Sequence, residues 1–261
     1  MSEIGMTQQS DEQRRIFEQE AIRTVTEAAG QGIILRVLGS LAFHIHCPKY
    51  DHIQKDLGRA YTDIDFAAYQ KQASQIGKFL SQMGYKEDAE INILFAGERL
   101  IYNHPTSGLH VDIFFNRLNF CHEVSWVGRL EVDQPTLPLA EMLLEKMQIV
   151  RINEKDIIDT IMLLLEHPLG DNDHETIHIG RISQLCAHDW GLWRTLTMNL
   201  GKVAQLGQEY AQLTIEDKKR LTAQVELALT QINAEPKTMA WKLRSKIGDR
   251  VKWYQEVDDV S

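Results

Sequence analysis

Cysteine is scarce in this chain, and no long apolar run is present. Only three cysteines, Cys47, Cys121 and Cys186, occur among the 261 residues, and none has a CxxC partner. An odd number at wide spacing fits reduced thiols rather than a disulfide framework. No apolar run approaches the roughly 18 residues of a membrane-spanning helix, so the sequence predicts no membrane association.

The chain also lacks an excess of positive charge. It has 28 lysines and arginines against 37 aspartates and glutamates, a net charge of -9. Proteins that coat nucleic acid normally carry a positive field, so this balance argues against a general coat and leaves only a local basic cleft. The first residues, MSEIGMTQQSDEQRR, lack the apolar core of a signal peptide. We therefore expect the protein in the cytoplasm.

The order of apolar patterns predicts an α+β protein. Helical spacing marks residues 10–29, which Ser10 can cap, and residues 70–83. Short branched runs predict strands at 33–38 and in the segment DIDF. Residues 48–61 are polar and charged and predict a long loop. Four further segments between residues 85 and 133, INILF, ERLIYN, LHVDIFF and WVGRLEV, predict more strands.

Beyond Pro135 and Pro138 nearly every segment is helical in pattern. Helices are predicted for LAEMLLEKMQIV, for KDIIDTIMLLLEH behind a capping Asn153, for one run over residues 182–206, and for the segment behind Thr214. The predicted fold is therefore a mixed β-sheet flanked by helices (residues 1–134), followed by an all-helical C-terminal domain (residues 135–261).

Two acids stand in a segment that otherwise predicts a buried strand, AYTDIDFAAY. Asp63 and Asp65 are two positions apart, so in a strand they share one face while Ile64 and Phe66 point to the other. Two carboxylates at such a short distance repel each other unless a cation lies between them. Oxygen ligands of this kind suit Mg²⁺. A lone DxD is nevertheless often a turn or a solvated edge.

A third acid and a Gly-Ser pair extend this pattern. Asp112 lies in the apolar segment LHVDIFF and would face the same cations if the two strands are neighbours. Two Mg²⁺ ions held by three carboxylates suit phosphoryl transfer. Gly39 and Ser40 follow a strand and begin a helix, where free N–H groups face a phosphate.

These segments, VLGS followed by TDIDF and HVDIFF, resemble the nucleotidyltransferase superfamily whose best-known member is DNA polymerase beta. The resemblance covers about residues 33–116. It implies that Asp63, Asp65 and Asp112 are catalytic and hold two Mg²⁺ ions, and that Gly39 and Ser40 bind the triphosphate. The implied reaction transfers a nucleoside monophosphate from an NTP to a hydroxyl.

A second resemblance covers LLEKMQIVRINEKDIIDTIMLL, which is similar to the abortive-infection type E toxin group and to uncharacterised bacterial nucleotidyltransferases. It implies that Lys146 contacts the triphosphate and that Asp156 or Asp159 lines the nucleotide site. The alternative is a charged helix face, with Lys155 and Asp159 as an i, i+4 pair.

Other interpretations stay open. The chain is a catalytically silent module of this fold, for instance half of a toxin and antitoxin pair, or the HExxH pattern of residues 174–178 marks a zinc hydrolase. The acceptor is a small molecule, an RNA or a protein hydroxyl. A basic C-terminal segment with aromatic residues is either an RNA contact or a solvated helix; its residues are Trp241, Lys242, Arg244, Lys246, Arg250, Lys252, Trp253 and Tyr254.

Overall fold

The computed structural model describes residues 10–94 and 97–256. The chain divides into two compact units, the first formed by residues 1–117 and 125–138 and the second by residues 118–124 and 139–261. The predicted boundary after residue 134 lies four residues before the start of the second unit's main segment at residue 139. The chain passes between the units within β6 (Arg117–Asn119) and β7 (Glu123–Ser125).

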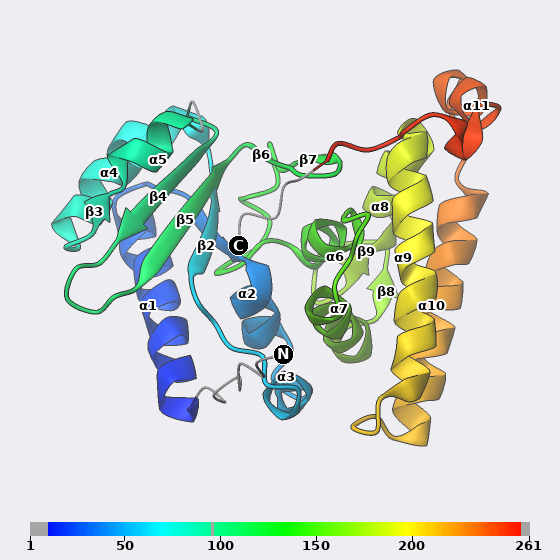
Figure 1. Ribbon diagram of the computed structural model, residues 1–261, viewed down its shortest axis with the longest axis horizontal. Helices are drawn as coiled ribbons and strands as arrows, with labels where there is room; N and C mark the ends of the chain where they lie inside the picture. The colour runs from blue at the N-terminus through cyan, green and yellow to red at the C-terminus, as the bar shows by residue number, and fades with distance from the viewer. Residues whose placement is uncertain (1–9, 95–96, 257–261) are drawn as a thin grey trace, which may run out of the picture. The chain divides into compact units, whose positions relative to one another are not determined.

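A five-stranded mixed sheet forms the centre of the first unit (Figure 1). Its strand order is β1-β2-β5-β4-β3; β2 and β5 are parallel, and every other neighbouring pair is antiparallel. This arrangement confirms the predicted mixed sheet. The strands are β1 (Leu35–Leu38), β2 (Ile64–Ala68), β3 (Lys86–Glu87), β4 (Arg99–Asn103) and β5 (His110–Phe115).

The two faces of the central strands differ in chemistry. Ile64, Phe66 and Ile113 are fully buried, and alternation places them on the face opposite to Asp65 and Asp112. One face therefore supplies the hydrophobic core of the unit, and the other carries charged groups.

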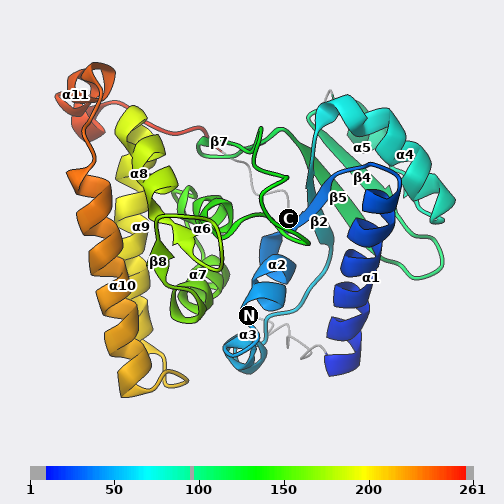
Figure 2. The ribbon, with the colours of Figure 1, turned by 180° about the vertical axis from the view of Figure 1, so that it is seen from behind.

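Helices flank the sheet, and α1 runs alongside it in the views of Figure 1 and Figure 2. The helix α1 packs against β1, and α2 packs against β1 and β2. Ser10 caps α1 through a capping box with Gln13, as its position before the helix predicts. The helices of this unit are α1 (Asp11–Gly30), α2 (Gly39–His46), α3 (Asp51–Asp56), the 3₁₀ turn η1 (Gln70–Gln72), α4 (Ala73–Gln82) and α5 (Ala89–Leu94).

Three local predictions in this unit are wrong. The segment INILF does not form a strand, because α5 occupies residues 89–94; Phe95 lies outside the described residues. The side chain of Asn92 instead bonds both the N–H and the carbonyl of Ile101 in β4. WVGRLEV forms successive turns with Gly128 at φ 75°. The expected loop at residues 48–61 contains α3.

The second unit is a bundle of helices in which α9 and α10 lie side by side (Figure 1). Asn153 and Thr214 cap α7 and α10 as predicted. The single helix expected over residues 182–206 is two, because the Asp189 carboxylate accepts from the N–H groups of Gly191 and Leu192 and begins a new helix. The helices are α6 (Leu139–Met147), α7 (Glu154–Glu166), α8 (Ile179–His188), α9 (Trp190–Glu209), α10 (Ile215–Ala234), α11 (Met239–Ser245) and the 3₁₀ turn η2 (Gly248–Arg250).

The HExxH pattern is not helical, which removes the basis for a zinc hydrolase. His174 and Glu175 lie in a bend, with Glu175 at φ 54°. His178 ends the short strand β9 (Ile177–His178), which pairs with β8 (Leu169–Gly170). A helix is needed to place both histidines on one face, so the spacing alone was misleading. Within residues 10–94 and 97–256, no helix is long and apolar enough to cross a membrane.

Candidate functional site

The pairing of β2 with β5 places two of the predicted acids side by side. Asp65 and Asp112 are direct partners in the parallel register, so their Cα atoms lie about 4.8 Å apart, the usual spacing of neighbouring strands. Asp63 directly precedes β2 and is exposed, Asp65 is half-buried, and Asp112 is 5% exposed. The geometry brings these three residues to the charged face of one sheet.

The Gly-Ser turn lies against the same acids. Leu38, the last residue of β1, pairs with Asp65, and Gly39 begins α2 at φ 71°. A Cβ added at Gly39 would lie 2.4 Å from Oδ2 of Asp65, which is too close for any side chain. Glycine is therefore required twice here, by the positive φ and by the approach of the carboxylate. Gly39 and Asp65 meet in spite of the long segment between them.

The segment between the Gly-Ser turn and β2, which includes α3, packs against α2. Gln54 in α3 donates to the backbone carbonyl of Ser40 at 3.4 Å and accepts at Oε1 from Tyr61 at 2.8 Å. Arg14 of α1 donates to both Gln54 and Asp51. These contacts connect the Gly-Ser turn to α3 and, through Arg14, to α1.

Arg99 is the functional candidate that the sequence analysis missed. Its Nε donates to both carboxylate oxygens of Asp112, each at 2.7 Å, and its Nη2 also donates to Oδ2. Burial lowers the pKa of Arg99, but its bonds to Asp112 and the nearby Asp65 and Asp63 outweigh burial and raise it. The signal was the single basic residue of the predicted strand ERLIYN.

The pKa of Asp112 is raised, chiefly by burial and also by the negative charge of Asp63, while Arg99 opposes the rise. Among the described residues, no group of three or more His, Cys, Asp or Glu side chains is arranged to hold a metal ion. Asp63 and Asp65 offer the one or two carboxylates that Mg²⁺ takes. The donor set therefore fits a single Mg²⁺ ion, and the metal assignment itself stays a prediction.

The other predicted nucleotide contacts lie in the second unit and form a cluster of their own. The Lys146 ammonium lies 3.0 Å from Asp156, 3.3 Å from Glu145 and 3.4 Å from Asp159. Its side chain is only 9% exposed, and that of Asp159 is fully buried. A phosphate would have to compete with these ion pairs for Lys146, so its role in binding a triphosphate stays a prediction.

The aromatic residues of the basic C-terminal segment are packed against one another. Trp241 meets Trp193 at 5.1 Å between ring centroids, and Trp253 meets Trp190 at 6.2 Å, both edge to face. Arg244 lies over Trp190 at 4.5 Å. These rings serve the packing of the second unit, and the contacts give no separate support to an RNA surface.

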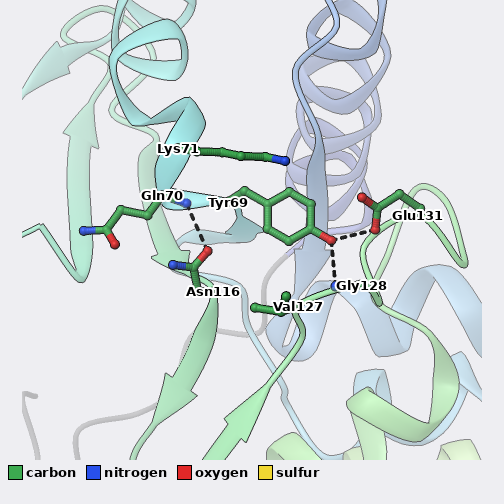
Figure 3. A pocket seen from close by; sticks show the side chains of 7 residues that line it. All are labelled: Tyr69, Gln70, Lys71, Asn116, Val127, Gly128 and Glu131. Carbon is green, nitrogen blue, oxygen red and sulfur yellow. Dashed lines mark hydrogen bonds between the residues drawn. The ribbon is translucent and has the colours of Figure 1, made fainter.

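A cavity of about 620 Å³ lies where β2 and β5 end (Figure 3). The Tyr69 hydroxyl donates to Glu131 at 2.6 Å and accepts from the Gly128 N–H, and Asn116 accepts from the Gln70 N–H. Tyr69 is four residues beyond Asp65, or about 13 Å along an extended strand. The cavity is therefore too far from the acids to hold the reacting atoms.

A scan against protein-family models finds no match, and a search of curated proteins finds no relative. Among solved structures, the chain is similar to an antigenic nucleotidyltransferase-like protein from Paracoccidioides brasiliensis, with a TM-score of 0.40 and 13% sequence identity. The match covers 88% of this chain and 96% of that one. A likeness this low carries no argument about activity.

Proposed function

We propose that the chain is a Mg²⁺-dependent nucleotidyltransferase that moves a nucleoside monophosphate from an NTP to a hydroxyl acceptor. The observation that carries this proposal is the approach of Gly39 to Asp65, beside Asp112 on the next strand. A phosphate-binding turn and metal-binding carboxylates are the two parts that such a reaction needs within reach of one substrate.

The turn would bind the phosphates. Leu38 is extended, and no side chain caps the start of α2. The backbone N–H groups after Gly39 are therefore of the kind that binds phosphate at a helix start. The missing Cβ of Gly39 makes room for the Asp65 carboxylate beside the turn, and the Ser40 hydroxyl would add a donor to the phosphate. Gln54 holds the Ser40 carbonyl and so keeps the turn in place.

The carboxylates would hold and activate the substrates. Asp63 and Asp65 would bind Mg²⁺, which neutralises the triphosphate and stabilises the leaving pyrophosphate when bound. Asp112, oriented by Arg99, would accept a hydrogen bond from the attacking hydroxyl and help to remove its proton. The assignment of Lys146, Asp156 and Asp159 as nucleotide contacts stays a separate prediction, because these side chains already form ion pairs with one another.

One observation favours a second candidate, a catalytically silent module of the same fold. Carboxylates held close together repel one another without a neutralising ion, which argues for a metal. Arg99 already neutralises Asp112, however, so the acids are less costly in its presence.

Labelled nucleotides would separate the two candidates. The protein is incubated with each α-labelled NTP, Mg²⁺ and a cell lysate, and the fraction that takes up label is identified. We expect transfer by the wild type and by the exposed control variant Asp171→Asn, and none by Asp63→Asn with Asp65→Asn. Nucleotide-dependent thermal stabilisation without transfer would support the silent module. If neither NTP nor Mg²⁺ shifts the melting temperature, both nucleotide-based candidates fail.

A further inference from the structure

The guanidinium of Arg99 is a fixed member of the acid cluster. It holds Asp112 through both carboxylate oxygens, a bidentate geometry that suits arginine and adds directional strength. The side chains are 23% and 8% exposed, so the pair is largely shielded from water. Arg99 also lies over the ring of Phe114, 5.0 Å from its centroid, which holds the fork in place.

The charge of Arg99 also acts on acids to which it is not hydrogen-bonded. Both Asp65 and Asp63 interact electrostatically with it. Strand pairing explains this, because Arg99 of β4 pairs with Phe114, two residues after Asp112 on the same face of β5. The positive charge is therefore built into the sheet, next to the carboxylates that were predicted to hold two metal ions.

The contacts of Arg99 limit how many ions the cluster can hold. Arg99 bonds both oxygens of Asp112, so a divalent ion would depend on the carboxylates of Asp63 and Asp65. The oxygens of Asp112 that a second ion would need are already bonded to Arg99, while Asp63 is exposed and half-buried Asp65 lies beside it.

We infer that this site takes one divalent ion per chain, held by Asp63 and Asp65, and that the Arg99 guanidinium takes the place of a second ion beside Asp112. This inference rests on the proposed function and changes its metal count from two to one. Arg99 cannot lose its proton in the working pH range, so it supplies a permanent positive charge at the third acid. It acts on Asp112 and is a positioning residue.

The number of bound ions tests the inference without any measurement of activity. Mn²⁺ is titrated into the full-length protein, with and without a non-hydrolysable NTP, and free Mn²⁺ is followed by electron paramagnetic resonance. We expect one ion per wild-type chain. Arg99→Gln should bind a second ion, because Asp112 is released, and Arg99→Lys, which keeps the charge, should stay at one. Adding Asp112→Asn to Arg99→Gln should return the count to one.

Matched controls keep the outcomes distinct. Arg117→Gln removes an exposed arginine that pairs with Glu98, and it should leave the count at one. Two ions in the wild type, or an unchanged count in a folded Arg99→Gln, would overturn the role of Arg99 and leave the nucleotidyltransferase proposal standing. No ion in the wild type, even with the nucleotide, would overturn both. If Arg99→Gln does not fold, Asp112→Asn alone decides: it should keep the count at one, and loss of the ion would show that Asp112 holds it.

Discussion

Each unit of the molecule contains three carboxylates around one cation, and the two clusters are built differently. In the first unit, Arg99 donates hydrogen bonds to both carboxylate oxygens of Asp112. Asp63 is exposed and Asp65 is half-buried. In the second unit, Lys146 lies within 3.4 Å of all three acids. An arginine fork selects one planar partner, whereas an ammonium is a point charge that several oxygens can share.

This difference in how the carboxylates are paired indicates which cluster can accept a ligand. Around Lys146 the carboxylates are 0 to 15% exposed, and each already has the same ammonium within ion-pair distance. The first cluster keeps carboxylates that water, and therefore a hydrated metal ion, can reach. The number of acids alone does not distinguish a binding site from a structural ion-pair network; the accessibility of each oxygen does.

Replacing Lys146 by methionine should have the largest effect on stability. Methionine keeps the length of the side chain but leaves three buried carboxylates without the ammonium. Breaking a buried ion pair from one side typically costs about 3 to 5 kcal/mol of unfolding free energy. Urea denaturation at neutral pH would measure it. Lys155→Met, on the exposed face of α7, is the control and should change stability by less than about 0.5 kcal/mol. Equal stability of the two variants would show that the Lys146 cluster is not structural.

A third cluster has the opposite composition: one carboxylate, that of Asp51, is shared by several cations. Asp51 bonds Arg14 at 2.8 Å, His44 at 2.5 Å and Lys55 at 3.0 Å. Burial raises its pKa, but the bonds from His44 and Lys55 and the charge of Arg14 outweigh burial and lower it. A lowered pKa contributes stability that is present above the unfolded value and lost as the pH falls.

We therefore expect Asp51→Asn to destabilise the protein by about 2 kcal/mol at neutral pH, the range of hydrogen bonds to charged groups. The difference from wild type should shrink as the pH falls below about 4, where the unfolded carboxylate takes up its proton. Chemical denaturation at a series of pH values would follow it. Asp56→Asn, exposed on the same helix, should show no such trend. A difference that does not depend on pH would assign the effect of Asp51 to packing instead of charge.

Local signals in the sequence were sufficient for much of the fold. Ser10, Asn153 and Thr214 cap the helices that they were expected to cap, because a cap depends on residues within one turn. Alternation in TDIDF and LHVDIFF likewise predicts the strands that carry Asp65 and Asp112. The failures are apolar segments such as INILF, whose choice between helix and strand depends on what they pack against.

The contacts of the candidate site were less predictable. That Asp65 and Asp112 share one face follows from the pairing of β2 with β5, and Asp63, directly before β2, is close enough for its charge to raise the pKa of Asp112. The position of Arg99 beside Asp112 depends on the register between β4 and β5, and a slip of one residue would turn it to the other face. No local pattern sets that register, so the contact of Arg99 with Asp112 could not be predicted from the sequence.

The last prediction tests the accessible cluster through its backbone. Gly39→Ala places a Cβ 2.4 Å from the Asp65 carboxylate at a positive φ, and such strain typically costs about 1 to 2 kcal/mol. Because the turn or Asp65 must shift to relieve the contact, the variant should also lose its thermal stabilisation by NTP and Mg²⁺. Gly30→Ala is the control, since nothing lies within 4 Å of the added Cβ, and it should keep that stabilisation. If a folded Gly39→Ala responded to NTP like the wild type, the phosphates would bind elsewhere, and the comparison of the two clusters would lose its functional meaning.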